Sequence, residues 1–429
     1  MKHSMRIVAI RGRQIFDSRG RPVVEAEVSL AGGAVGRASV PSGASTGRHE
    51  AHELRDGDPS MHEGRGVLRA VAHVDGEIAQ LLSGRDARDQ AGIDTSMRAL
   101  DGTANLERLG ANAVLAVSLA VCRAAALAES LPLHRYIAAL ASNDAPMLPM
   151  PMVNILSGGA HAGRSMDVQD FLVVPIGAKR YADALRMALD VRRAAQILLS
   201  RRGVTTLLAD EGGLSPGFRS AAEALELMVA AIDSAGLSPG RDAAIAIDVA
   251  ASELFDAGAY DWPREGRRLS REDMISIVDA WRRHYPVISV EDALHEDDWE
   301  GWTRLTETAG DLQLVGDDLF ATNIDRIDRG IRTRAANAVL IKPNQNGTLS
   351  GALDAIAHAR RNGLATIVSA RSGETADAFI ADLAVGSGAG QIKIGSVRSS
   401  ERMTKYNRLL RIAEDSVLPF ASVPARGSS

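Results

Sequence analysis

Two lysines stand out in this 429-residue chain, which has only five lysines against forty-four arginines. Lys342 follows the apolar run AVLI, and Lys393 lies in GQIKIG. A guanidinium stays protonated in proteins, whereas a partly desolvated ammonium can lose its proton near neutral pH. The two positions therefore indicate sites that need a removable proton, although chance survival of two lysines explains the count equally well.

Acidic residues end several other apolar runs. Asp248 ends AIAID, Glu291 ends VISVE, and Asp317 follows LQLVG. Carboxylate oxygens without histidine or thiol partners suit Mg²⁺ better than zinc. Three unpaired anions in one cleft would repel each other strongly, so a divalent cation is expected among them.

The remaining strand-end groups complete a possible reaction. Arg371 and Ser372 could bind a phosphate or carboxylate. A metal and an arginine nearby would depress the pKa of a lysine, which could then remove a proton α to a carboxylate. Metal ions would stabilise the enediolate-like dianion, and Glu211 would donate a proton to a departing hydroxide. These groups predict β-elimination of water from an anionic 2-substituted carboxylate.

The spacing of these residues predicts their scaffold. From about residue 150, short apolar runs alternate with helical patterns, and from Glu211 onward their polar ends are 22 to 43 residues apart by subtraction, one strand–helix unit each. A lone aspartate at such an end more often caps the next helix. A series of them predicts a β/α barrel whose strand ends share one mouth. The predicted run ends are Asp170, Glu211, Asp248, Glu291, Asp317, Lys342, Arg371 and Lys393.

The first third of the chain has a different pattern. Alternating residues predict strands within 5–40, and a long loop, PSGASTGRHEAHELRDGD, follows. Helical patterns lie around 63–83, 86–100 and 110–129. We therefore expect two domains: an N-terminal α+β domain over residues 1–145 with a mobile active-site loop, and a catalytic barrel over 146–429.

Composition narrows the class of protein. A net charge of −5 argues against a nucleic-acid partner. Cys122 is the only cysteine, so no disulfide framework is expected. Asn112, Ser118 and Arg123 interrupt the longest apolar run, 111–128, which favours a packed helix over a membrane span. The N-terminal residues lack the pattern of a signal peptide, so a cytoplasmic protein is expected.

Longer motifs along the chain resemble the enolase family. They include DSRGRPVVEAEV, VPSGASTG, LDGTANLERLGANAVLAVSLA, SGGAHAG, ADEGG, VGDDLFATN, LIKPNQNGTL, ARSGETADAFIADLAVG, GQIKIGS and ERMTKYNRLLRI. The resemblance covers nearly the whole chain. It implies an N-terminal α+β capping domain on a modified β/α (TIM-type) barrel, assembled as a homodimer or larger oligomer. It also implies interconversion of 2-phosphoglycerate and phosphoenolpyruvate, a small phosphorylated carboxylate substrate, and two Mg²⁺ ions.

The resemblance also implies a role for each matching residue. Lys342 would be the base and Glu211 the general acid. Asp248, Glu291 and Asp317 would hold the first metal ion, and Ser45 the second when its loop closes. The residues expected to contact the substrate are His161, Gln169, Asp170, Arg371, Ser372 and Lys393.

The chain departs from the family pattern around the expected pocket. Ala370 stands where the family has histidine, and Asp170 stands where it has glutamate. By resemblance, both positions belong to the wall around the leaving hydroxymethyl group, so their change opens that wall. The other departures are Leu214, Asn346, Ile394 and Arg48.

Three interpretations follow. The protein could be a divergent enolase in which Glu211 alone serves the departing hydroxide. It could be a paralogue that applies the same enolisation to a modified substrate in a phosphonate pathway, as carboxyphosphonoenolpyruvate synthase does, with Arg48 suiting extra negative charge. It could also be a non-catalytic binding protein on an enolase scaffold, but the intact Glu211, Lys342 and Lys393 argue against that.

Overall fold

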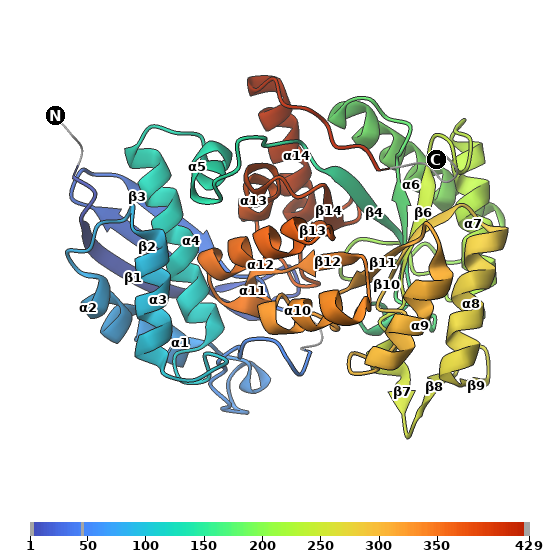
Figure 1. Ribbon diagram of the computed structural model, residues 1–429, viewed down its shortest axis with the longest axis horizontal. Helices are drawn as coiled ribbons and strands as arrows, with labels where there is room; N and C mark the ends of the chain where they lie inside the picture. Colours follow the sequence, from blue (N-terminus) through green and yellow to red (C-terminus); the bar gives the residue numbers. More distant parts are fainter. Residues whose placement is uncertain (1–3, 44–46, 424–429) are drawn as a thin grey trace.

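The computed structural model describes residues 4–43 and 47–423. A small sheet with its helices lies at one end, and a closed barrel ringed by helices lies at the other (Figure 1). The predicted boundary at residue 145 falls between the last helix of the first part and the first barrel strand.

The N-terminal part is built on an antiparallel sheet of β1 (Ile7–Phe16), β2 (Pro22–Leu30) and β3 (Val35–Ser39), as the alternating sequence predicts. The predicted pattern at 63–83 is divided into short pieces, α1 (Leu68–His73), a π-helical segment Val74–Ile78 and α2 (Ala79–Leu82). The next helices are α3 (Gln90–Asp101), α4 (Ala111–Ala128) and α5 (Leu133–Leu140). The sequence patterns do not anticipate α5.

Helix α4 is the core of this part. It is long and apolar enough to cross a membrane, yet 83% of it is buried inside the protein. It packs against β2 and β3, and Cys122 is buried within it. The backbones approach so closely that a Cβ on Gly36 would lie 2.1 Å from the carbonyl oxygen of Ala120. The prediction of a packed helix is confirmed.

The second part is the predicted barrel, closed in the order β10-β11-β12-β13-β14-β4-β5-β6. The strands are β4 (Met150–Ser157), β5 (Asp170–Val174), β6 (Ala244–Asp248), β10 (Val287–Glu291), β11 (Gln313–Gly316), β12 (Ala338–Ile341), β13 (Ala365–Ser369) and β14 (Gln391–Gly395). Strand β5 runs antiparallel to both of its neighbours, and the other pairs are parallel.

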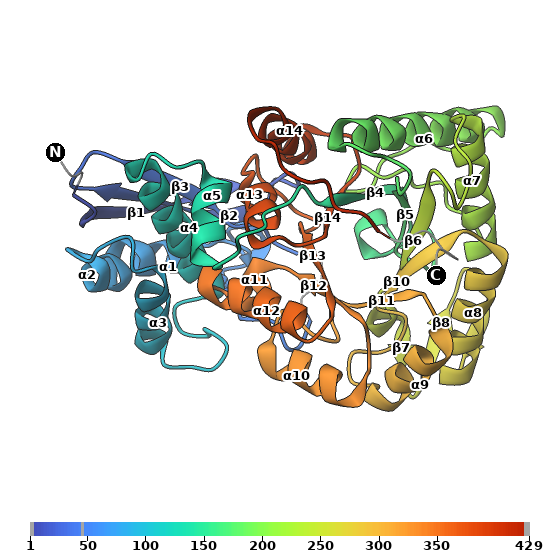
Figure 2. The same ribbon diagram turned by 45° about the horizontal axis from the view of Figure 1, so that its top comes forward.

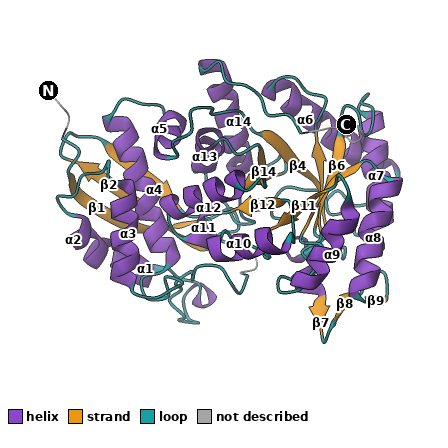
Figure 3. Ribbon diagram, viewed as in Figure 1, coloured by secondary structure: helices purple, strands orange, loops and turns teal. Residues whose placement is uncertain are grey.

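Helices surround the barrel (Figures 2 and 3). They are α6 (Tyr181–Arg201), α7 (Ala221–Ser234), α8 (Arg271–His284), α9 (Trp299–Ala309), α10 (Ile324–Thr333), the short α11 (Pro343–Asn346), α12 (Leu349–Arg361), α13 (Phe379–Ser387) and α14 (Ser400–Asp415). A small sheet of β7 (Phe255–Asp256), β8 (Ala259–Trp262) and β9 (Arg267–Leu269) projects at the lower right of Figure 1. This insertion accounts for the longest predicted spacing between strand ends, the one from Asp248 to Glu291.

Three predicted strand ends are wrong. Lys393 is the middle residue of β14 and does not end it. Asp170 begins β5 instead of ending a strand, but the reversed direction of β5 still brings it to the mouth where other strands end. Glu211 follows no strand, because residues 202–220 form a loop between α6 and α7. In that loop Leu207 and Leu208 are exposed, whereas Leu214, paired with β4, and Phe218 are buried. An apolar run in the sequence does not by itself show whether its side chains are buried.

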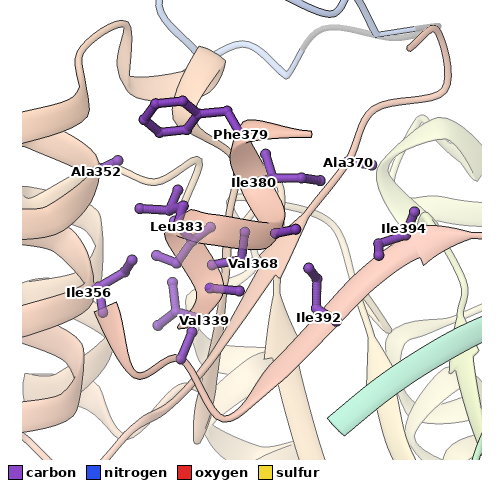
Figure 4. Packing of buried hydrophobic residues seen from close by; sticks show 14 of the residues in the cluster. Val339, Ala352, Ile356, Val368, Ala370, Phe379, Ile380, Leu383, Ile392 and Ile394 are labelled. Carbon is purple, nitrogen blue, oxygen red and sulfur yellow. The ribbon is translucent and has the colours of Figure 1, made fainter. Parts of the chain in front are cut away.

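Apolar side chains fill the space between the barrel and its helices. Val339, Val368 and Ile392 point outward from β12, β13 and β14 toward α12 and α13 (Figure 4). Ile394 belongs to the same buried cluster, so this departure from the family pattern serves packing. Lys393 precedes it, and alternation along the strand sends the lysine to the opposite face.

Candidate active site

The barrel strands and the N-terminal part enclose one polar pocket. Gly43 and Glu50 come from the N-terminal part. The predicted site residues that line the pocket are His161, Gln169, Asp170, Glu211, Asp248, Asp317, Lys342, Arg371, Ser372 and Lys393. Glu291 is buried and bonded to Lys393. Ser45 lies outside the described residues.

Lys342 and Lys393 lie among the predicted metal ligands. Lys393 Nζ is 2.6 Å from Asp248 Oδ2 and 2.8 Å from Glu291 Oε1, and Lys342 Nζ pairs with Asp317 Oδ2. Strand β14 stands four places from β10 in the ring, so Lys393 reaches across the barrel to Glu291. Three carboxylates and two ammonium groups thus form one buried cluster.

The predicted depression of the lysine pKa values requires a metal ion beside them, because the protein groups alone act in the opposite direction. Burial lowers the pKa of Lys342, but the negative charges of Asp317, Glu291 and Glu50 together outweigh it and the pKa is raised. Burial also opposes the charge of Lys393, and Asp248 and Glu291 raise its pKa well above the ordinary value. Each ammonium lies closer to a carboxylate than to another cation. Either lysine becomes a base only when another positive charge compensates these carboxylates.

The carboxylates fit a divalent metal ion. Asp248, Glu291 and Asp317 come from β6, β10 and β11, which are neighbours in the barrel, and Asp248 pairs with Glu291 in register. Burial, then the charge of Asp248, raises the pKa of Glu291 well above its ordinary value, which shows how strongly the acids repel. An all-oxygen set of this kind suits Mg²⁺, so these three residues would hold the ion.

Two further acids belong to this cluster, and sequence reasoning missed them. Oxygens of Asp292, Asp317 and Asp318 lie within 4.8 Å of one another. The Asp292 carboxylate accepts hydrogen bonds from the backbone N–H groups of Asp317 and Asp318, at 2.9 and 2.8 Å. Burial and the charge of Asp317 raise the pKa of Asp318 to about 8. Asp292 directly follows Glu291 in VED, and Asp318 directly follows Asp317 in VGDD, so adjacent acidic residues could have indicated both positions.

Asp170 and His161 form a buried ion pair on the other side of the barrel. Asp170 Oδ1 accepts hydrogen bonds from Asn154 at 2.6 Å and Ser157 at 2.9 Å, and lies 3.2 Å from His161 Nε2. Burial disfavours the imidazolium, but the charge and hydrogen bond of Asp170, with the charges of Glu211 and Asp248, together outweigh it and raise the pKa of His161 to about 9. His161 is therefore protonated at neutral pH. The short Asp170 side chain is held toward β4.

Glu211 lies next to this pair and is a carboxylate. Its oxygens come within 4.8 Å of ligand atoms of His161 and Asp170. Burial raises the pKa of Glu211, but the positive charges of Arg402 and His161 outweigh burial and the pKa is lowered. The sequence-based prediction places the acidic proton on Glu211 alone. The raised pKa of His161 and the lowered pKa of Glu211 favour the neighbouring His161 as the group that holds this proton.

The proposed anion-binding residues are held by the N-terminal part. Arg371 Nη1 donates to Glu50 Oε2 at 2.7 Å, and both side chains are buried. Ser372 Oγ accepts a hydrogen bond from Arg19 at 3.2 Å. Glu50 was not predicted, although it lies in the loop that the sequence marks as functional. The pocket is therefore complete only where the two parts meet.

The departures from the family pattern have different surroundings. Ala370 lines the pocket, and its N–H donates to the Lys393 carbonyl at 2.8 Å. Leu214 is buried in the core. Asn346 accepts a hydrogen bond from Arg98 at 2.6 Å, away from the pocket.

Arg48 lies outside the site. Its side chain is 71% exposed and lies 3.6 Å from Asp297. It does not line the pocket, so the expected role for Arg48 in binding extra negative charge finds no support in this arrangement.

A β/α barrel with one reversed strand, a separate N-terminal sheet, and carboxylates and lysines at one mouth define an enolase-type α/β protein. Residues 7–137 match the model for the enolase N-terminal domain, and residues 145–421 match the model for the enolase C-terminal TIM barrel domain. The chain belongs to the enolase family. Membership supports a lyase-type enzyme, and the family generally uses Mg²⁺.

Proposed function

We propose that this protein is a Mg²⁺-dependent lyase that interconverts 2-phosphoglycerate with phosphoenolpyruvate and water. The main support is the placement of Lys342, directly after β12, and Asp170, at the start of β5, because these strands are four places apart in the ring of eight. A proton-accepting amine and the proton-bearing His161 pair thus approach the pocket from opposite sides. An elimination that removes a proton and a hydroxide from opposite faces of a substrate needs this arrangement.

Each charged group then has a task. Arg371 and Ser372 bind the substrate phosphate, and Lys393 binds its carboxylate. Lys342, as the neutral amine, takes the C2 proton. The C–H electron pair forms the C2–C3 double bond as the C3–O bond breaks.

The leaving hydroxide takes the proton of His161, which Glu211 orients, and departs as water. Mg²⁺ held by Asp248, Glu291 and Asp317 would stabilise negative charge on the substrate and compete with the ammonium groups for the same oxygens.

An assay of phosphoenolpyruvate formation tests this function. Purified protein with saturating Mg²⁺ and 2-phosphoglycerate should give the rise in ultraviolet absorbance of the enol product. Heat-inactivated protein is the control. No product, with the protein folded and the metal present, would contradict the proposal.

A second candidate is the same enolisation on a modified substrate, such as one with a phosphonate-type group. The observation that favours it is Ala370, which leaves only a methyl group on the pocket wall. On this alternative the protein would exchange the C2 proton of 2-phosphoglycerate without efficient elimination. Ala370→His should then raise turnover, whereas no C2 exchange at all would indicate a non-catalytic scaffold.

A further inference from the structure

Helix α14 brings three buried polar side chains to the loop that carries the anion-binding residues. Resting on the proposed function, we infer that Arg402 and its neighbours on α14 are positioning residues for Arg371, Ser372 and Lys393. The helix lies beside α13 and β14 (Figure 1). None of its side chains lines the pocket, so its effect on the reaction is indirect.

Arg402 joins the ends of two barrel strands. Its side chain has no exposed surface. Nη1 donates to the carbonyls of Arg371 and Ile394 at 2.7 and 2.9 Å, and Nη2 donates to the carbonyl of Ser372 at 2.5 Å. One planar group therefore fixes the main chain of both anion-binding residues and of the residue that follows Lys393.

Lys405 holds the next part of the same loop. Its Nζ lies 2.8 Å from Glu374 Oε2 and 3.0 Å from the carbonyl of Thr375. The other oxygen of Glu374 accepts the backbone N–H of Arg371 at 3.1 Å. A second buried cation thus orients the main chain of Arg371 through a carboxylate.

Tyr406 connects helix α14 to the loop that carries Glu211. Its hydroxyl donates to the carbonyl of Gly395 at 2.7 Å. The next residue, Ser396, donates its N–H to the carbonyl of Glu211 at 2.9 Å. The loop that carries Glu211 therefore rests on the segment that Tyr406 holds.

The cost of this arrangement points to a positioning role. Residues 370–378 form a loop between β13 and α13, and its pairing with Ser42 begins only at Gly373, so strand pairing does not hold the carbonyls of Arg371 and Ser372 in place. Burying a guanidinium against carbonyls costs free energy unless its donors are satisfied. Arginine satisfies three acceptors in one plane, which a lysine ammonium cannot do in this geometry.

The test compares Arg402→Lys with Arg408→Met. Arg408 lies on the same helix and makes a bidentate ion pair with Asp382, away from the pocket. We expect Arg402→Lys to raise the KM for 2-phosphoglycerate roughly 10- to 100-fold with a smaller change in kcat, because a displaced anion site loses ground-state binding. Arg408→Met should lower the unfolding temperature and leave KM unchanged.

Equal KM values for wild type and Arg402→Lys would overturn the inference, and so would an equal rise in KM for Arg408→Met. If Arg402→Lys does not fold, Tyr406→Phe replaces it, since this change removes one hydroxyl. It should raise KM or lower kcat by about threefold to tenfold, and no change in either would be contrary to the inference.

Binding of inorganic phosphate, measured by calorimetry, separates this inference from the proposed function. If the wild type binds phosphate but forms no phosphoenolpyruvate, the proposed function fails. Weaker phosphate binding by Arg402→Lys would then still support positioning. A wild type that binds no phosphate would contradict both.

Discussion

At the scale of single residues, the site is defined by which charges compensate each other. Lys342 and Lys393 neutralise buried carboxylates, while His161 neutralises Asp170. These pairs favour the protonated forms of Lys342, Lys393 and His161, and a sequence pattern does not reveal such pairs. The raised pKa values of the two lysines depend on their distances to Asp317, Asp248 and Glu291, which a sequence pattern does not contain.

The His161–Asp170 pair predicts a pH dependence of stability. The pKa of His161 rises from an ordinary value near 6.5 to about 9 on folding. The pair therefore stabilises the folded state fully below pH 6.5, and this contribution is lost as pH rises through 9, on the order of 3 kcal/mol at most.

Urea unfolding in EDTA at pH 6 and pH 9 measures this effect. Wild type should lose more stability between these pH values than His161→Gln. The same loss in both proteins would show that His161 does not carry the proton.

At the scale of elements, strand order and direction could be only partly predicted. The strand–helix spacing identifies β6 and β10 to β14, because each holds apolar residues and has a charged residue within it or shortly after it. It does not reveal that β5 runs backward, since an apolar run reads the same in either direction. Glu211 could not be placed from pattern alone, because its loop reaches the mouth by pairing with β4, a contact distant in sequence.

The contact between β3 and α4 gives a prediction for the N-terminal part. Gly36→Ala would push a methyl group onto the carbonyl of Ala120 and onto the backbone of Ala124. We expect a loss of about 3 kcal/mol of unfolding free energy, because backbone atoms of a buried helix cannot yield.

Urea denaturation provides the measurement, and Gly390→Ala is the matched control. A Cβ at Gly390 would meet no atom within 4 Å. Equal stability of Gly36→Ala and wild type would show that the sheet and helix are not packed this closely.

At the scale of the whole molecule, the pocket depends on both parts of the chain. Glu50 and Arg19 reach the anion-binding residues from the N-terminal part, Gly43 of the same part lines the pocket, and the barrel supplies the other residues described there. The two-part organisation could be predicted, because the repeated strand–helix pattern begins only near residue 150. The Glu50–Arg371 contact was not, because it joins residues more than three hundred positions apart.

Removing the metal tests the molecule as a whole. EDTA should abolish phosphoenolpyruvate formation, and excess Mg²⁺ should restore it, because the carboxylates otherwise keep Lys342 protonated. Mg²⁺ should also raise the unfolding temperature, since it binds only the folded site. Full turnover in chelator would exclude the metal role.

The central claim is that Lys342 removes the C2 proton, and exchange of that proton into deuterated solvent measures it most directly. With Mg²⁺ and 2-phosphoglycerate, proton NMR should show loss of the C2 signal with wild type. Lys342→Arg keeps the charge but should slow exchange by at least about 100-fold, because arginine cannot accept the proton. Exchange by Lys342→Arg at the wild-type rate would contradict the account.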